Sequence, residues 1–476
     1  MKKERYKHMA EFFHGSRVRE KATPVTGTTA NTALPVFFGT APKGPVNEPV
    51  RVSSKAEAAA IFGYSTDFES YTIHEAMESH FTLYKQRDAI LVNVMDVSKA
   101  KKSNTATIDL SKQVTETSIL YPVLDTVTLK GAADLEKDKD YEVALNDEGY
   151  LVITIPAGSA VKVPATGLTL TCDMPDVSKV KASDIIGGIQ EDTRTGLELL
   201  DVMMPLLGDV PKLVLAPKFS ADPAVADAMA AKAQNINGIF RAVTLIDIDT
   251  TTAKTIAAAI DGKKANDPGT YVCWPKVVHN GLQYHMSTHV AGIIGQMDTD
   301  NAGIPTASPS NRQMVADGCV LSDGTPVLLG LDQVNKLNAQ GITTAFRFIG
   351  GFVLWGNRTS AYPDNKDMKD NMLASKRTMF WINNFVITDT FQDIDRQVNR
   401  NFIQMIIDKI SLKFNGLVSA GAILGGRIEY DPGENPEEDL MNGIVRFKLF
   451  VGLTPIAEAI EFTLQFDTSY LKALAS

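Results

Sequence analysis

Short apolar runs alternate with segments of helical spacing over much of the chain. Runs typical of buried strands are KLVLAP (212–217), RAVTLIDI (241–248) and TYVCWPKVV (270–278). Between the first two lies AVADAMAAKA (224–233), which has helical spacing and is preceded by Asp222-Pro223, an N-cap followed by proline at the first helical position. Strands that alternate with helices in this way predict a layered α/β sheet.

The same rhythm is present nearer the N-terminus. LPVFFGTAPKGP (34–45) predicts a strand closed by a Gly/Pro turn, and AILVNV (89–94) predicts a buried strand. Ser54 and Glu57 have capping-box spacing, so we expect a helix that begins there and ends at Gly63.

From about Lys99 to Lys181 the helical period is lost. Segments such as TVTLKG, YLVITIPAG and LTLTC alternate as strands do and are separated by Gly, Asp and Pro turns. We expect a small β-sandwich or barrel here, inserted into the α/β domain because the α/β rhythm resumes directly afterwards.

A third region begins near Leu331. It predicts a strand at TAFRFI (344–349), a long helix over Asp389–Leu417, and late strands at 443–453 and 460–467. The last of these alternates most clearly, with one apolar face made of Ile460, Phe462, Leu464 and Phe466.

These patterns predict a multidomain α/β and β protein. The expected parts are an N-terminal arm (1–22), a discontinuous α/β domain (23–98 and 182–330), an inserted β-domain (99–181), an α+β C-terminal domain (331–459) and a C-terminal strand or arm (460–476).

Composition narrows the class of protein. The 476 residues are 44% hydrophobic and 22% charged, as in a folded globular protein, and the net charge of −9 argues against a duplex-DNA binder. The three cysteines, Cys172, Cys273 and Cys319, are too scattered for a disulfide scaffold or a CxxC metal site. The basic first residues lack an apolar run behind them, and no spanning apolar run occurs, so we expect neither a signal peptide nor membrane insertion.

Motifs of catalysis are absent from the sequence. It contains no GxxxxGK[ST], GxGxxG or GxSxG. His285 and His289 have the spacing of two metal ligands but lack the glutamate of HExxH, so half-buried histidines on a helix are the simpler interpretation. Asp298–Gly303 starts like a calcium loop but has Ala302 and Pro309 where ligands belong, which favours a polar loop. The acidic run 434–439 favours a solvated turn. We therefore expect no catalytic residue, cofactor or metal.

Several segments, taken in order, resemble one known family. They are PVFFGTAPKGPVNEPVRVSSKAEAAAIFG (35–63), DIIGGIQEDTRTGLELL (184–200), KLVLAPKFS (212–220), SPSNRQM (308–314), FVLWGNRT (352–359), SKRTMFWINN (375–384) and GLTPIAEAIEFTLQF (452–466). In this order and spacing they resemble the tail sheath protein of contractile-tailed bacteriophages and related phage-tail-like bacteriocins. The departures are local: Lys376 stands for one arginine of a usual pair, and the arm reads HGSRVRE (14–20).

The resemblance implies a structural sheath subunit rather than an enzyme. In this family six subunits form a disc around the tail tube, discs stack helically, and contraction drives the tube through the host envelope and leads to genome ejection. The C-terminal domain is innermost, and arms from both chain ends add strands to a small sheet in neighbouring subunits. The implied partners are other copies of the chain, the tail tube protein, and baseplate and tail terminator proteins, with no direct nucleic-acid contact. The implied location is the virion tail, assembled in the cytoplasm of the bacterial host.

The resemblance also selects candidate interaction residues. For the intersubunit C-terminal strand they are Ile460, Phe462, Leu464 and Phe466, and for the N-terminal arm they are Phe12, Phe13 and Val18. The alternative is that both termini pair within their own domain. Basic pairs on the predicted long helix are candidate tube contacts, namely Arg396, Arg400, Lys409 and Lys413. The alternative for them is a solvated helix face that pairs with Asp393, Asp395 and Asp408.

Two other functions remain open from the sequence. The α/β rhythm alone is compatible with an enzyme of unknown chemistry, although a fold does not imply a reaction. The sheath could also belong to a secretion-type contractile system, but such sheaths commonly consist of two different chains, which favours the phage or bacteriocin type.

Overall fold

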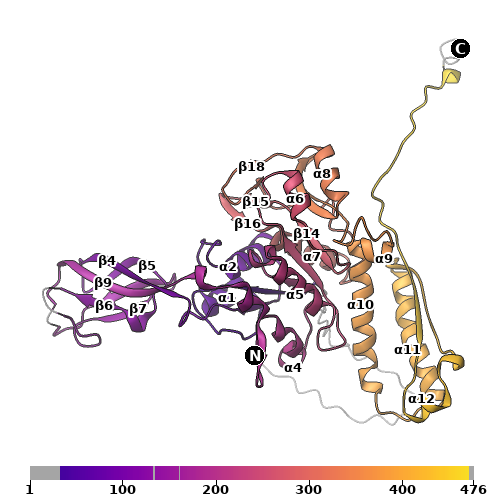
Figure 1. Ribbon diagram of the computed structural model, residues 1–476, viewed down its shortest axis with the longest axis horizontal. Coiled ribbons are helices and arrows are strands. Elements are labelled where there is room, and N and C mark those ends of the chain that lie inside the picture. Colours follow the sequence, from indigo (N-terminus) through magenta and orange to yellow (C-terminus); the bar gives the residue numbers. More distant parts are fainter. Residues whose placement is uncertain (1–32, 132–133, 160, 471–476) are drawn as a thin grey trace, which may run out of the picture. The chain divides into compact units, whose positions relative to one another are not determined.

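A computed structural model describes residues 33–131, 134–159 and 161–470 of the chain. Within these residues, eight strands form a central sheet in the order β2-β3-β1-β12-β13-β14-β19-β20 (Figure 1). Neighbouring strands from β3 to β19 run parallel, and the edge strands β2 and β20 are antiparallel to their neighbours. The strands, in sheet order, are Val50–Val52, Ala89–Asn93, Pro35–Gly39, Leu213–Leu215, Val243–Asp247, Thr270–Cys273, Ile342–Phe348 and Gly351–Trp355.

Both faces of this sheet are covered, which explains the near-continuous apolar runs of its strands. In β1, Phe37 enters one hydrophobic cluster while Val36 and Phe38 enter the other. The first cluster packs against α1, α2 and α7, and the second against α5 and α6. These helices are Lys55–Phe62, Thr72–Met77, Met286–Asp300, Pro223–Ala233 and Ile256–Gly262. The expected mixed α/β class is confirmed.

Local signals placed several helix ends correctly. Ser54 caps α1 by accepting from the Glu57 N–H, and Gly63 ends it. Asp222 caps α5, with Pro223 at its first position. Other short elements of the core are a π-helical turn (Glu78–Leu83), α3 (Ala182–Ile186), β10 (Gly188–Gln190), β11 (Thr193–Thr195), α4 (Met203–Leu207), β15 (Lys276–His279), β16 (Leu282–Tyr284), β17 (Gly318–Val320), β18 (Pro326–Val327) and α8 (Leu331–Asn338).

The segment expected to be an inserted β-domain contains two antiparallel sheets, β4-β9-β6 and β5-β8-β7. Apolar side chains of both sheets share one hydrophobic cluster that includes Leu110, Leu151 and Leu170. The strands are β4 (Lys101–Leu110), β5 (Val114–Leu120), β6 (Thr128–Lys130), β7 (Glu142–Leu145), β8 (Tyr150–Thr154) and β9 (Ala165–Pro175).

Tyr121 fastens this segment to the α/β core. Its hydroxyl accepts from the Tyr64 N–H at 2.8 Å and donates to the Tyr64 carbonyl at 3.0 Å. A Cβ at Gly63 or Gly149 would lie within 2.8 Å of the Tyr121 ring, so only glycine leaves room for it. The contact lies at the end of α1.

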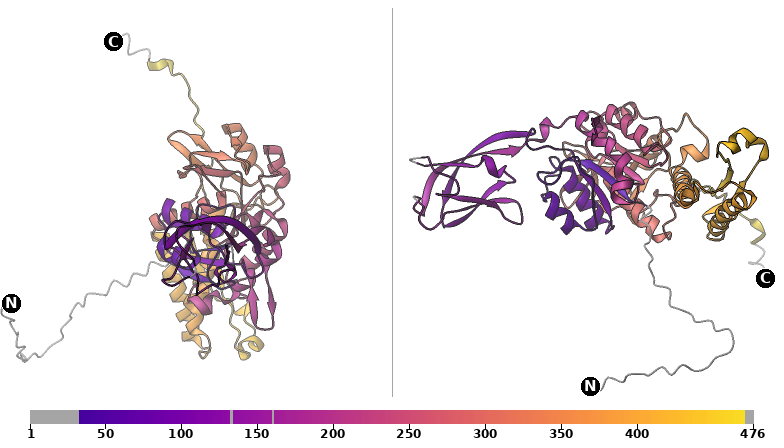
Figure 2. Two further views of the ribbon diagram at one scale, coloured as in Figure 1. Left: turned by 90° about the vertical axis from the view of Figure 1, so that its left-hand side faces the viewer. Right: turned by 90° about the horizontal axis from the view of Figure 1, so that it is seen from below.

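The C-terminal region is built on two helices that lie side by side in both views (Figures 1 and 2). Phe385 of the first helix and Phe414 of the second are 6.4 Å apart between ring centroids. A two-stranded antiparallel sheet, β21-β22, packs on the second helix and shares its hydrophobic cluster. The elements are α9 (Met368–Asn371), α10 (Leu373–Thr390), α11 (Arg400–Ser419), β21 (Ile423–Glu429), α12 (Glu437–Met441) and β22 (Lys448–Leu453).

The prediction of one long helix over 389–417 was wrong. α10 ends at Thr390, and α11 begins only at Arg400, where Asn399 caps it by accepting from the Phe402 N–H. Asp395, between the two helices, has φ of +66°, which no helix allows. Ile394 and Val398 therefore belong to an exposed loop and not to the apolar stripe of a helix.

Candidate interaction surface of the C-terminal region

Helix α10 joins the core to the C-terminal hydrophobic cluster. Phe380 packs in the core, whereas Phe385 packs against α11. The buried Arg377 guanidinium forms a bidentate ion pair with the buried carboxylate of Asp298 in α7. Desolvation by burial raises the pKa of Asp298, and Arg377 opposes this shift. The expected polar loop at Asp298 was therefore wrong, because this residue is part of a buried link between two helices.

A second link between α10 and the core is made by one side chain. The Asn384 carboxamide accepts from the Arg241 N–H at 3.0 Å and donates to the Arg241 carbonyl at 2.8 Å. Because the amide satisfies both backbone groups, it fixes α10 against Arg241, two residues before the start of β13. The two links together hold the helix that carries the C-terminal region.

The two-stranded sheet β21-β22 has one covered face and one exposed face. On the covered face, the ring of Phe414 packs where a side chain at Gly426 would stand, 2.7 Å from its Cβ position. On the other face Leu424 and Phe450 are exposed, and the Arg427 guanidinium lies 3.9 Å from the Phe450 ring centroid. Within the described residues, the outer edge of each strand has no ladder partner. Such a sheet can accept a further strand.

A groove of about 670 Å³ lies between the start of α11, the end of β21 and α12. Ile403, Ile407 and Ile428 give it an apolar lining, and Arg400 stands at its side. Apolar side chains of another segment could be buried in this groove.

The basic residues expected to contact a tube are mostly paired within the chain. Lys409 is 2.8 Å and Arg396 3.3 Å from the buried Asp393 carboxylate. Lys413 is 3.5 Å from Asp389. The expected spacing of Arg396 and Arg400 on one helix was wrong, because Arg396 precedes α11. These contacts favour the alternative of pairing with neighbouring carboxylates, although the main partner besides Asp393 is Asp389.

The apolar positions of the predicted C-terminal strand are exposed. After β22 the described chain up to Phe466 is assigned to no helix or strand (yellow in Figure 1). The exposed fractions are 73% for Ile460, 90% for Phe462, 98% for Leu464 and 77% for Phe466. The expected ladder is thus not made within the described part of this chain. The N-terminal candidates Phe12, Phe13 and Val18 lie outside the described residues.

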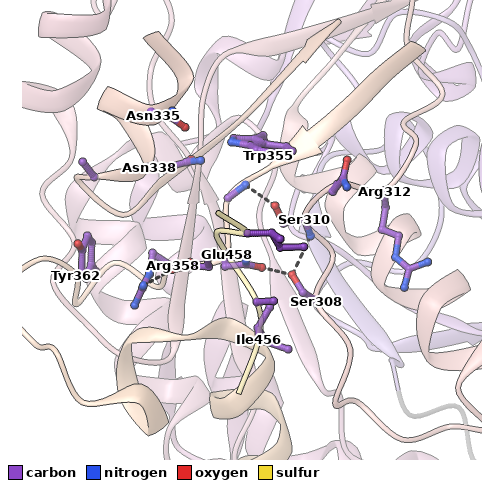
Figure 3. Close-up of a pocket in the computed structure, with 16 residues that line it drawn as sticks. Ser308, Ser310, Arg312, Asn335, Asn338, Trp355, Arg358, Tyr362, Ile456 and Glu458 are labelled. Carbon is purple, nitrogen blue, oxygen red and sulfur yellow. Dashed lines mark hydrogen bonds and ion pairs between the residues drawn. The ribbon is translucent and has the colours of Figure 1, made fainter. Parts of the chain in front are cut away.

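The root of this C-terminal extension (residues 454–470) lines a pocket of about 860 Å³ (Figure 3). Its other walls are residues 308–312, the end of α8 and the turn after β20. Glu458 forms an ion pair with Arg358 of that turn, 100 residues away. The quoted segments FVLWGNRT and GLTPIAEAIEFTLQF meet here, although sequence reasoning did not pair them.

The candidate metal histidines have protein partners. His285 precedes α7, and its Nδ1 lies 2.7 Å from the Glu75 carboxylate, which also accepts from the His285 N–H. His289 is fully buried, its Nδ1 is 2.9 Å from the Tyr84 hydroxyl, and burial lowers its pKa to about 3. No group of three potential metal ligands occurs among residues 33–131, 134–159 and 161–470. These residues are also more buried than the expected half-buried histidines.

Two buried carboxylates meet the first turn of α7. Glu75 accepts from the backbone of His285, and Asp247, at the carboxyl end of β13, accepts from the Ser287 N–H at 2.9 Å. Burial raises the pKa of Asp247. Carboxylates at this position stabilise the positive end of a helix, so the cluster holds α7 in place.

No helix in the described part of the chain is long and apolar enough to cross a membrane.

Comparisons with known proteins agree with this architecture. The family described as phage tail sheath protein central domain matches residues 192–360. The tail sheath protein of Burkholderia phage BcepMu is 28% identical over 98% of this chain and 99% of its own length.

Two solved assemblies share the fold. One is the sheath complex of an extracellular contractile injection system, PVC, in the contracted state, with a TM-score of 0.58, 13% identity and coverage of 97% and 99% of the two chains. The other is the contracted helical sheath of the anti-feeding prophage, with a TM-score of 0.56, 15% identity and coverage of 95% and 99%. These similarities, over residues 192–360 to the phage tail sheath protein family and over almost the whole chain to a phage tail sheath protein, identify the chain as a contractile tail sheath subunit, which is a structural protein.

Proposed function

We propose that this chain polymerises as stacked hexameric discs around a tail tube and contracts to drive the tube through a host cell envelope. The observation that supports this proposal most directly is the C-terminal extension, which exposes apolar side chains on alternate residues to solvent. A soluble chain gains nothing from ordering such a segment unless the segment docks elsewhere. The C-terminal region of a second copy has exposed apolar side chains and unpaired strand edges on which the extension could dock.

The proposed dock is the two-stranded sheet β21-β22 of a neighbouring subunit. Its exposed Leu424 and Phe450 and its unpaired strand edges match a strand that has one apolar face. Each ladder hydrogen bond contributes about 0.5 to 1.5 kcal/mol, and each apolar side chain that becomes buried about 1.5 to 3 kcal/mol before ordering costs. A strand of this kind therefore links neighbours by several kcal/mol.

The proposal includes the placement of the other parts of the chain. The arm 1–22 provides a second link, 331–459 forms the inner domain, 23–98 with 182–330 forms the outer domain, and 99–181 is a peripheral insertion. Of the contracted sheaths of similar fold, one belongs to an extracellular contractile injection system and the other is the helical sheath of the anti-feeding prophage, which supports a polymer in the tail of a particle. The partners are the tail tube, baseplate and tail terminator proteins, and assembly takes place in the host cytoplasm.

Truncation tests the proposal. Deleting 461–476 should leave a folded protomer that no longer forms sheaths, because the deletion removes the linking strand. Removing only 471–476 is the matched control, since it keeps every apolar residue of the strand. Sedimentation and negative-stain electron microscopy measure the polymer, and sheaths of normal length from the longer deletion would contradict the proposal.

Contraction has its own test. Expressed alone, the protein should form short, wide tubes, because without a tube template subunits go directly to the contracted lattice. Co-expression with the tube and baseplate proteins should give longer and narrower sheaths. Narrow sheaths from the protein alone would contradict the proposal that the extended state has a higher free energy than the contracted state.

A further inference from the structure

The C-terminal extension is fastened to the core at one point before it becomes free. Glu458 pairs with Arg358, and the other nitrogen of that guanidinium, Nη1, donates to Asn371 Oδ1 at 2.8 Å. The guanidinium carbon of Arg358 lies 4.7 Å from the Tyr362 ring centroid. Arg358 is therefore held on two sides by its own domain, and its Nη2 donates to Glu458 (Figure 3).

The turn that carries Arg358 is itself fixed. The Gly356 N–H donates to the Ser310 hydroxyl at 3.0 Å, and the Gly356 carbonyl accepts from the Tyr271 hydroxyl at 2.5 Å. Tyr271 is part of β14, in the middle of the central sheet. A force applied to Glu458 would thus pass through Arg358 into the sheet.

The fastened point leaves little slack before the apolar strand. Ile460 lines the pocket and is also the first of the alternating apolar residues. At about 3.3 Å per residue, the strand from Ile460 to Phe466 extends about 20 Å from the pocket. A neighbour must present its dock within that distance.

We propose that Arg358 is the positioning residue of the intersubunit strand: through Glu458 it sets the point and direction from which the strand leaves its own subunit. The inference rests on the proposed docking of this strand to a second copy of the chain. It adds that neighbouring subunits are joined through a fixed root and not through a flexible linker.

Charge variants at this pair test the effect on assembly. Glu458→Gln should leave the thermal unfolding of the protomer unchanged within error but raise the critical concentration for sheath formation about fivefold, since a strand without a fixed root must be ordered at docking. Arg358→Glu should do the same, and combining it with Glu458→Arg should restore much of the loss. A purely local structural role would instead lower the thermal unfolding temperature of the protomer together with its assembly.

Two variants control for the loss of charge. Glu461 is exposed and lies three residues beyond Glu458, and Arg312 lines the same pocket as Arg358. Neither Glu461→Gln nor Arg312→Gln should change the critical concentration by more than twofold. If they act as strongly as Glu458→Gln, general electrostatics and not positioning would explain the effect.

A distance measurement on the full-length protomer, below its polymerisation concentration, tests the fixed root without assembly. The three native cysteines are buried, so spin labels can be placed at Lys336→Cys and Thr463→Cys, both exposed. The distribution of distances should be narrow in the wild-type background and broad with Glu458→Gln. Equal widths would overturn the inference.

The outcomes separate this inference from the proposed function. If deleting 461–476 abolishes sheaths while Glu458→Gln assembles like wild type, positioning by Arg358 is wrong and the docking strand stands. If the deletion assembles normally, the docking strand is wrong, and the inference falls with it.

Discussion

The inserted β-segment buries nearly all of its large apolar side chains, whereas the C-terminal region exposes many of them. Among the described residues of the insertion, Val114 is the only large apolar residue with an exposed side chain. The two sheets of the insertion bury their other large apolar side chains fully or partly, most of them in one shared hydrophobic cluster. The C-terminal region instead exposes large apolar side chains on its loop, helix, strands and extension, including Phe391, Leu412, Leu424, Met441, Phe450, Phe462 and Leu464.

This difference indicates where the polymer is made. A segment that buries its own apolar surface has no need of a partner, whereas exposed apolar side chains beside unpaired strand edges mark an interaction surface. We therefore expect changes in the C-terminal region to act on assembly and changes in the insertion to act locally.

The largest effect should come from charges on the apolar face of the extension. Phe462→Asp with Leu464→Asp should raise the critical concentration for sheath formation at least about 100-fold, because buried carboxylates without partners cost several kcal/mol. The matched control puts the same two charges on the other face, as Thr463→Asp with Gln465→Asp, and should assemble nearly as wild type. If Val114→Asp in the insertion disrupted sheaths as strongly, the contrast between the two regions would be wrong.

The next effect concerns the covered face of β21. Gly426→Val should destabilise the C-terminal region by about 1 to 3 kcal/mol, because the new side chain collides with Phe414. Gly425→Val is the matched control, since a Cβ there meets nothing within 4 Å. Hydrogen exchange of α11 should rise for the first variant only, and equal protection in both would show that the packing of α11 on this strand is not tight.

The core sheet was predictable because its sequence signals are local. Apolar runs such as KLVLAP mark strands buried on both faces, and Ser54 and Asp222 satisfy the first N–H groups of the helices that follow them. Alternation likewise marked Ile460–Phe466 as an amphipathic strand, while the structure adds that its apolar face is bare.

The sequence predictions failed where the structure depends on contacts between residues far apart in the chain. Apolar spacing continued across 389–417, so nothing local revealed that Asp395 turns the chain or that Asn399 starts a new helix. The Arg377–Asp298 and Arg358–Glu458 pairs join residues 79 and 100 positions apart. Periodicity carries no information on such pairs, and only the quoted motifs marked the segments that contain them.

Acid should destabilise the core through its buried histidines. Neither the inserted β-segment nor the C-terminal region contains a histidine, so neither is destabilised in this way. Burial lowers the pKa of His74 and His80 to about 4 and that of His289 to about 3, from 6.5. A histidine whose folded pKa is depressed binds its proton first in the unfolded state, so stability is full above pH 6.5 and falls as the pH drops toward 4. Each such histidine contributes a slope of up to about 1.4 kcal/mol per pH unit.

Urea unfolding between pH 7.5 and 4.5 measures this slope. Asp247 and Asp298, whose pKa values are raised by burial, act in the opposite sense, so the informative quantity is the difference between variants. His80→Gln should flatten the slope by about one group, whatever its effect at neutral pH. An unchanged slope would mean that His80 is protonated as easily in the folded core as in the unfolded chain.

The smallest effect on assembly should come from removing the insertion. Lys101 and Pro175 pair directly across β4 and β9, so a short Gly/Ser bridge can replace 102–174 without moving the strand ends. The deletion keeps Val177 and Val180, which pack on the core side, and removes Tyr121 with its hydrogen bonds to Tyr64. Because the insertion closes over its own cluster, the critical concentration for sheath formation should change by less than about twofold, while the protomer loses about 1 kcal/mol at the vacated Tyr64 backbone. A protomer that fails to fold, or folds but stays monomeric, would show that the insertion is part of the core or of the polymer contacts, and the contrast between a closed and an open region would no longer hold.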